Sequence, residues 1–162
     1  MGFAFQPVRG NWEYKLMDTA SAATFGKGAL VAFDTARNLQ EATVGSEKLI
    51  GIALHRSVDS FPAGKVLVAI PMDNSAVCTG PIETDVVSSA LSVGQGYTFE
   101  KSGNTLRIDV DSQASAYFEL VGPTKNGTLD TTQISETSRV EAVMFRGILA
   151  IPSAASLLVP AP

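Results

Sequence analysis

The sequence predicts an all-β fold, either a small barrel or a sandwich, with extended apolar arms at its N- and C-terminal ends. Val, Ile, Thr and Phe recur in short runs that Gly, Pro, Asn and Asp interrupt. This composition and spacing are typical of strands joined by turns. Long helical periodicity is almost absent, and the 162 residues suffice for one compact unit.

Seven short segments have the length and composition of strands. Seven strands are enough to build a small barrel or a sandwich. In order along the chain they are Ala29–Phe33, Leu49–Leu54, Lys65–Ile70, Tyr97–Glu100, Thr105–Val110, Tyr117–Val121 and Arg139–Phe145.

The hairpin between Tyr97 and Val110 is the best defined of these features. Residues 101–104 (Lys-Ser-Gly-Asn) supply a turn between two runs of alternating polarity. In the second run, Arg107 and Asp109 alternate with apolar residues. That alternation indicates an antiparallel sheet with one face in the core and the other in water.

Glycine-ended turns precede three of the expected strands. Residues 25–28, 61–64 and 91–94 each end in Gly directly before an apolar run. Glycine adopts the positive φ angles that let a chain reverse into a strand. We interpret the three segments as a recurrent turn rather than as an internal duplication.

Two further segments lack a clear strand pattern. Residues 85–91 (Asp-Val-Val-Ser-Ser-Ala-Leu) form either a short helix or a connecting strand, since periodicity cannot decide over so few residues. Residues 124–138 are rich in Thr, Ser, Asn and Gly, which predicts a long surface loop of the kind that is often functional.

Charge and cysteine content exclude several classes of function. The net charge is −4 and the lysines and arginines are scattered singly, which argues against binding of nucleic acid or anionic lipid. The lone Cys78 excludes an internal disulfide. Neither a secretory signal nor an apolar stretch long enough to span a bilayer is evident. We therefore expect the protein to be made in the cytoplasm.

Candidate chemical groups are few and isolated. His55 is the single histidine and follows an apolar run, so a surface or strand-end position is favoured over catalysis. Cys78 has small and apolar neighbours, which favours a buried structural role. Asp109 and Asp111 would share a strand face and could meet a cation, but no calcium-loop pattern surrounds them. We expect no enzyme, no metal and no cofactor.

The two ends of the chain are apolar. Large aromatic residues occur early, and no charge follows Arg146. Apolar ends are expected to dock, either on the chain's own core or on a neighbouring subunit. We expect an N-terminal arm at residues 1–23, a barrel or sandwich body at 24–146 and an apolar tail at 147–162.

Three segments, Phe25–Asp34, Lys48–Ala53 and Ala63–Ile70, resemble the head decoration (cement) proteins of tailed bacteriophages. The order is a Gly-bounded strand ending near Asp, a Gly-Ile-Ala strand and a Gly-led aliphatic strand. The resemblance covers residues 24–70. It implies a small β-barrel or β-tulip-like body, a homotrimer and attachment to the outside of an assembled capsid.

Termini in that family reach onto the shell or a neighbouring subunit. By position, the resemblance therefore implies that the apolar residues of both ends are partner-binding anchors. The partner would be the major capsid protein, and the protein would be located at the virion capsid surface. The candidate residues are Phe3, Phe5, Trp12, Leu157, Leu158 and Val159.

Three functions remain as hypotheses from the sequence. The first is a structural virion protein that clamps adjacent coat subunits, because repeated weak contacts add up through symmetry. The alternative is a glycan-binding β module of a phage tail or surface adhesin, using the loop at 124–138. The third is a small hydrolase with two carboxylates distant in the sequence.

Overall fold

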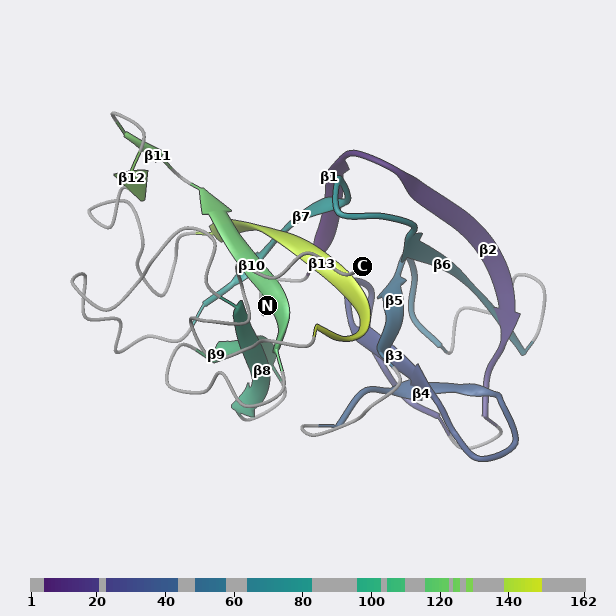
Figure 1. Ribbon diagram of the computed structural model, residues 1–162. Coiled ribbons are helices and arrows are strands. Elements are labelled where there is room, and N and C mark those ends of the chain that lie inside the picture. Colours follow the sequence, from purple (N-terminus) through teal and green to yellow (C-terminus); the bar gives the residue numbers. More distant parts are fainter. Residues whose placement is uncertain are drawn as a thin grey trace.

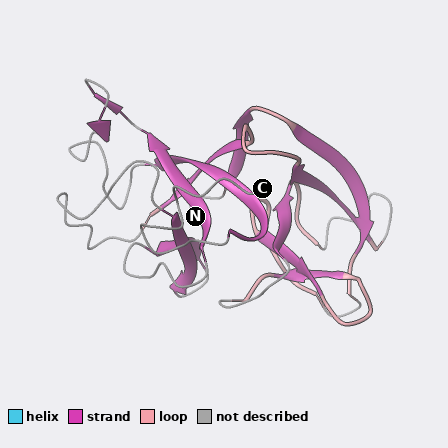
Figure 2. Cartoon of the chain, viewed as in Figure 1, coloured by secondary structure: helices cyan, strands magenta, loops and turns pink. Residues whose placement is uncertain are grey.

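The computed structural model describes residues 5–20, 23–43, 49–57, 64–82, 96–102, 105–109, 116–122, 124–125, 128–129 and 139–149. All regular secondary structure within these ranges is β-strand, as Figure 2 shows. The predicted all-β class is therefore confirmed. The strands form three antiparallel sheets.

The first large sheet has five strands in the order β2-β6-β5-β3-β4. It forms one lobe of the molecule, with β2 along its outer rim (Figure 1). All of its strand pairs are antiparallel. Its strands are β2 (Trp12–Asp18), β3 (Leu30–Phe33), β4 (Leu39–Glu41), β5 (Leu49–Ala53) and β6 (Lys65–Pro71).

The second large sheet has six strands in the order β1-β7-β13-β10-β8-β9. A separate two-stranded ribbon, β11 (Thr124–Lys125) with β12 (Thr128–Leu129), lies beyond β10 (Figure 1). The six strands are β1 (Gln6–Arg9), β7 (Val77–Pro81), β8 (Gly96–Ser102), β9 (Thr105–Asp109), β10 (Ala116–Gly122) and β13 (Arg139–Leu149).

Both large sheets curl strongly. A single parallel bridge joins Thr19, just after β2, to Leu39 of β4, so the two edges of the five-stranded sheet meet there. A second bridge joins Ile82, just after β7, to Ile108 of β9. Among the described residues neither curl is completed by a continuous ladder, so each sheet is rolled but open.

The two sheets share one hydrophobic core. Side chains of the five-stranded sheet alternate between two environments: Leu30 and Ala32 enter the core between the sheets, whereas Val31 enters a second cluster with Val66 and Val68. Burial on both faces explains why β5 and β6 are nearly continuous apolar runs rather than alternating ones.

Aromatic rings fill the centre of the shared core. Phe5 stacks on Phe118 with ring centroids 5.3 Å apart, and Phe99 meets Tyr117 at 5.5 Å. All four rings are fully buried or nearly so. Such pairs add to the stability that burial alone provides, so this cluster ties the N-terminal segment to the six-stranded sheet.

All seven strands expected from the sequence are present, as β3, β5, β6, β8, β9, β10 and β13. Gly28 and Gly64 have the positive φ angles, 84° and 74°, that the turn pattern predicted. The ribbon β11–β12 occupies part of the expected loop at 124–138, and residues 85–91 lie outside the described ranges.

The N-terminal segment differs from the extended arm that the sequence predicted. Residues 6–9 pair with β7 in one sheet and residues 12–18 pair with β6 in the other. Backbone pairing holds this segment in the body, because a paired strand satisfies the hydrogen-bonding groups that a free arm leaves to water. At the other end, β13 continues three residues past Arg146, to Leu149.

Candidate functional site

The outer strand β2 carries two of the large apolar side chains that are exposed in the described part of the chain. Tyr14 is 56% exposed and Leu16 is 41% exposed. In the uninterrupted pairing with β6, alternate residues point to opposite faces. Trp12, Tyr14 and Leu16 therefore share one face of the sheet, and Glu13 and Lys15 lie on the other.

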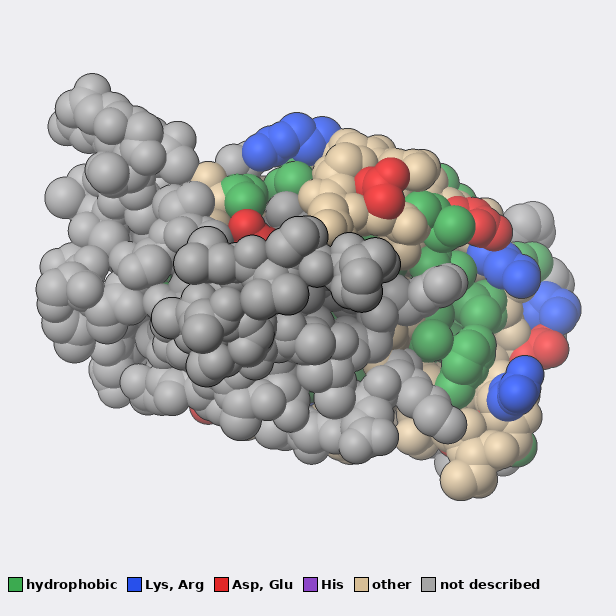
Figure 3. Space-filling view, viewed as in Figure 1, with side chains coloured by type: hydrophobic (Ala, Val, Ile, Leu, Met, Phe, Trp, Pro, Cys, Tyr) green, Lys and Arg blue, Asp and Glu red, His purple; other side chains and the backbone are tan. Residues whose placement is uncertain are grey.

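The apolar face continues onto the neighbouring strands. Leu16 lies directly opposite Leu67 of β6, and the Leu54 backbone N–H donates to the carbonyl of Leu67 from the next strand. Leu54 and Leu67 are both half-buried. Figure 3 shows hydrophobic side chains over this lobe, bordered by charged ones. An apolar patch with a polar rim is the usual form of a protein-binding surface.

A hydrogen-bonded corner fixes the start of β2. Gly10 has a φ of +90°, and a Cβ there would lie 1.7 Å from the Ser75 carbonyl oxygen, so only Gly fits. The Asn11 backbone N–H donates to Ser75 Oγ (3.0 Å), and the Asn11 amide donates to Asp73 Oδ2 (3.1 Å). The corner thus holds β2 against the turn between β6 and β7.

Asp73 is the acceptor at the centre of this corner. It accepts from Ser75 Oγ at 2.6 Å and from the Ser75 backbone N–H at 2.8 Å. These bonds, followed by the one from Asn11, lower the pKa of the Asp73 carboxyl from its usual 3.8. Hydrogen bonds to the ionised form favour that form, so the corner is built for a carboxylate.

The predicted anchors of the N-terminal end occupy different environments. Phe5 is 1% exposed and belongs to the chain's own core, which is one of the two fates expected for an apolar end. Trp12 is half-buried at the edge of that core, and its indole N–H donates to the Arg9 carbonyl (2.9 Å). The other predicted anchors, Phe3, Leu157, Leu158 and Val159, lie outside the described residues.

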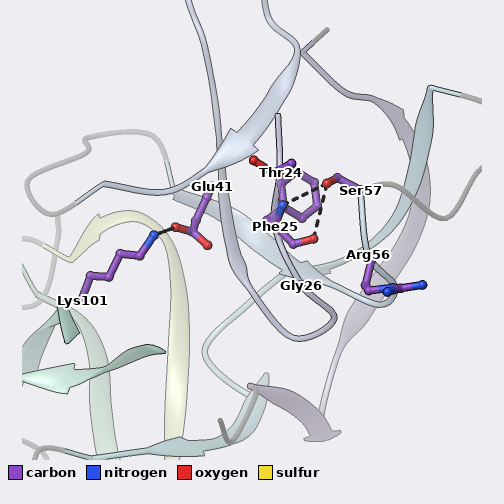
Figure 4. Close-up of a pocket in the computed structure, with 7 residues that line it drawn as sticks. All are labelled: Thr24, Phe25, Gly26, Glu41, Arg56, Ser57 and Lys101. Carbon is purple, nitrogen blue, oxygen red and sulfur yellow. Dashed lines mark hydrogen bonds and ion pairs between the residues drawn. The ribbon is translucent and has the colours of Figure 1, made fainter. Parts of the chain in front are cut away.

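An open cleft of about 470 Å³ lies where the two large sheets meet (Figure 4). Lys101 of β8 and Glu41 of β4 form an ion pair that spans the sheets at this cleft. On the other side, Ser57 Oγ accepts from the Phe25 backbone N–H at 2.9 Å. The lining also includes Thr24, Gly26 and Arg56. Among the described residues, this mixed lining includes no histidine, cysteine or carboxylate pair, and we assign it no chemistry.

The isolated histidine is committed to the backbone. His55 Nε2 accepts from the Leu67 backbone N–H at 3.1 Å, and Nδ1 lies 3.1 Å from the Arg56 carbonyl oxygen. Because Nε2 is the acceptor, the ring proton resides on Nδ1 and is donated to Arg56. His55 thus joins the end of β5 to β6, in the strand-end position that the sequence favoured.

The remaining candidate groups do not assemble into a site within the described ranges. Cys78 is fully buried in β7, as predicted from its neighbours. Asp109 is half-buried at the end of β9, and Asp111 lies outside the described residues. Among the described residues, no cluster of three His, Cys, Asp or Glu side chains is placed to hold a metal ion.

Comparisons with known proteins identified no match to this chain. No family model, no curated protein and no solved structure matches the chain. The part of the chain that the structure describes also contains no helix long and apolar enough to span a membrane.

Strand β2 was not among the strands expected from the sequence. Residues 12–18 mix aromatic, charged and aliphatic side chains, but residues 12–16 alternate strictly between apolar and charged. A period-two test over these residues was the available signal.

Proposed function

We propose that this protein is a structural component that binds the outer surface of an assembled phage capsid and clamps adjacent coat subunits. Residues 24–70, which carry the resemblance to head decoration proteins, correspond to β3, β4, β5 and β6. These four strands belong to one sheet with its own cluster of buried residues. The part that resembles the family is thus one continuous structural unit.

The exposed apolar face of β2 is the observation that carries this proposal. Tyr14 and Leu16 stand on the rim of that same sheet and are about half exposed. Because each side chain is already half buried, covering the remainder contributes about half of the 1.5–3 kcal/mol that full burial provides. A cement protein needs only modest contacts of this kind, since symmetry repeats them over the whole shell. The major capsid protein is the partner proposed for this face.

The finer features follow from the resemblance and are part of the proposal. They are a small barrel or tulip-like body, a homotrimer in solution and a location on the virion surface. Partners that bind only the assembled shell stabilise it by mass action, so the activity requires no catalytic group. Apolar residues at the chain ends would add contacts to the same shell.

The test is binding to undecorated heads of tailed phages. The wild-type protein should co-sediment with the heads saturably and raise the temperature at which they release DNA. The double variant Tyr14→Ala/Leu16→Ala should bind at least about tenfold more weakly, because it removes both of the large exposed apolar side chains of β2. Val8→Ala, which truncates an equally exposed residue on β1 (48%), is the matched control and should bind normally.

Two outcomes would contradict the proposal. One is the absence of saturable binding by the wild-type protein across the heads tested. The other is binding that Tyr14→Ala/Leu16→Ala leaves unchanged, since the face of β2 would then have no part in attachment. Circular dichroism of each variant verifies that the sheets are intact before binding is measured.

A further inference from the structure

The outer edge of β2 has no partner strand in the described part of the chain. β2 is the terminal strand of its sheet and pairs with β6 on one side only, over residues 12–18. The side chains along it are exposed or half-buried. A free edge of this length offers a row of backbone donors and acceptors to another strand.

Two hydrogen bonds define which backbone groups face that edge. The Met72 N–H donates to the Asn11 carbonyl at 3.0 Å, and the Thr19 N–H donates to the Gly64 carbonyl at 2.9 Å. In an antiparallel ladder, alternate residues bond to the same neighbour. The odd-numbered residues from 11 to 19 therefore bond to β6. The N–H and C=O groups of Trp12, Tyr14 and Leu16 face outward.

We propose that β2 pairs with β2 of a second copy of this chain, antiparallel, across a two-fold axis at Tyr14. Tyr14 then lies opposite the partner's Tyr14. Trp12 lies opposite the partner's Leu16, and Glu13 lies opposite the partner's Lys15. The Tyr14 pair lies on the axis and occurs once, and each of the other pairs occurs twice, as a two-fold interface requires. The outward-facing backbone groups become the hydrogen-bonded pairs.

The charges on β2 select this register over its neighbours. Glu13 and Lys15 are both exposed and lie on the same face. With the axis at Tyr14 they form two opposite-charge pairs, in the closer, non-hydrogen-bonded positions of the ladder. Moving the axis to residue 15 would place Lys15 against the partner's Lys15, and moving it to residue 13 would place Glu13 against the partner's Glu13.

The same register also brings together the apolar side chains on the opposite face of β2. Residues directly across an antiparallel pair point to the same side. Trp12, Tyr14 and Leu16 of both copies therefore form one continuous apolar stripe across the joined sheets. Aromatic and aliphatic cross-strand pairs are among the favourable ones. The backbone groups, the charges and the apolar residues therefore all favour the register with the axis at Tyr14.

This pairing is independent of capsid binding. It requires only a second copy of the chain and uses the edge of β2, whereas the proposed capsid contact uses the face. A two-fold contact joins two copies only, so it is additional to any three-fold association. Failure of one proposal therefore leaves the other standing.

Analytical ultracentrifugation over a concentration series tests the charge pairing. Lys15→Glu places like charges at both pairs and should weaken association at least about tenfold. The double variant Glu13→Lys/Lys15→Glu restores opposite charges and should restore association. A wild-type mass that stays constant up to millimolar protein, or a mass that Lys15→Glu leaves unchanged, would overturn the proposal.

A proline and a pair of cysteines test the edge and the register. Tyr14→Pro removes an N–H that faces outward, so it should abolish the pairing and leave the bonds to β6 intact. Tyr14→Phe is its control and should associate as the wild type does. Glu13→Cys mixed with Lys15→Cys should form an intermolecular disulfide on oxidation, because Cα atoms in such pairs are about 4.5 Å apart.

Each cysteine variant alone should remain uncross-linked, and so should the wild type, whose Cys78 is buried. A disulfide formed by Lys15→Cys alone would indicate the register with the axis at residue 15. Absence of any disulfide from the mixture, or dimers of Tyr14→Pro at wild-type strength, would refute pairing through this edge.

Discussion

The ring of Phe5 lies directly against the backbone of Gly80 in β7. A Cβ at Gly80 would stand 2.2 Å from Phe5 Cε1 and 2.3 Å from Cδ1. Phe5 cannot swing away freely, because it is buried and stacked on Phe118. The absence of a side chain at Gly80 is therefore what admits the N-terminal segment to the core.

Gly80→Ala should lower the free energy of unfolding by about 1–3 kcal/mol, because the added methyl overpacks the Phe5 site. Urea denaturation measures the change. Gly26→Ala is the matched control, since a Cβ there meets nothing within 4 Å, and it should be nearly neutral. If the cost is steric, combining Gly80→Ala with Phe5→Leu should cost less than the sum of the two single changes. Strict additivity would contradict this explanation.

His55→Ala should lower the free energy of unfolding by about 1–2 kcal/mol. It leaves the half-buried Leu67 N–H without its acceptor, and an unmade hydrogen bond costs the desolvation of the orphaned group. His55→Gln, which offers an amide oxygen, should lose less. Hydrogen exchange of the Leu67 amide reports the bond directly. Equal losses for the two variants would show that the acceptor is unimportant.

Asp73 makes the fold sensitive to acid. Its folded pKa lies below the unfolded value because of bonds from Ser75 and then Asn11. A lowered carboxyl pKa stabilises the fold above the unfolded value and loses that contribution as the pH falls through the folded value. Wild-type stability should therefore decline below about pH 3.8, and Asp73→Asn should decline less steeply.

Ser75→Ala gives an independent version of the same measurement. It removes the largest cause of the shift, the hydroxyl bond to Asp73, and should also flatten the acid decline. Urea titrations at a series of pH values follow the effect. An unchanged pH dependence in both variants would mean that this corner does not link protonation to folding.

Thr98→Val should leave stability unchanged or raise it by up to about 1 kcal/mol. Thr98 is 4% exposed in β8, and among the described residues nothing bonds its Oγ1. Replacing an unsatisfied hydroxyl with a methyl of similar shape removes a desolvation cost. Thr98→Ala, the size control, should be less stable than Thr98→Val. A loss above about 1 kcal/mol for Thr98→Val would indicate that the hydroxyl makes a stabilising bond.

Several strands with strong burial could be predicted from the sequence, but β7, which is buried at four of its five positions, was not among them. β5 and β6 are buried on both faces, so their composition alone identifies them. β2 is mostly exposed, so its signal in the sequence is limited to the alternation of apolar and charged residues at 12–16. β1 contains Pro7, which argues against a central strand but suits the edge that β1 occupies.

The candidate surface was beyond prediction for a different reason. Whether Tyr14 is exposed depends on the position of β2 at the end of its sheet, which is a property of long-range pairing. The sequence instead emphasised the aromatic residues near the N-terminus, and Phe5 proved to be a core residue. Side-chain type indicates that a residue will be buried, but not whether its own chain or a partner buries it.

The connection between β1 and β2 has a consequence for synthesis on the ribosome. β2 pairs with residues 65–71 and β1 with residues 77–79, so both strands are made long before their partners. At about 5–20 residues per second, they wait for several seconds. During that interval the apolar face and both edges of β2 are available to other nascent chains. A chaperone that covers this early segment should therefore raise the yield of folded protein.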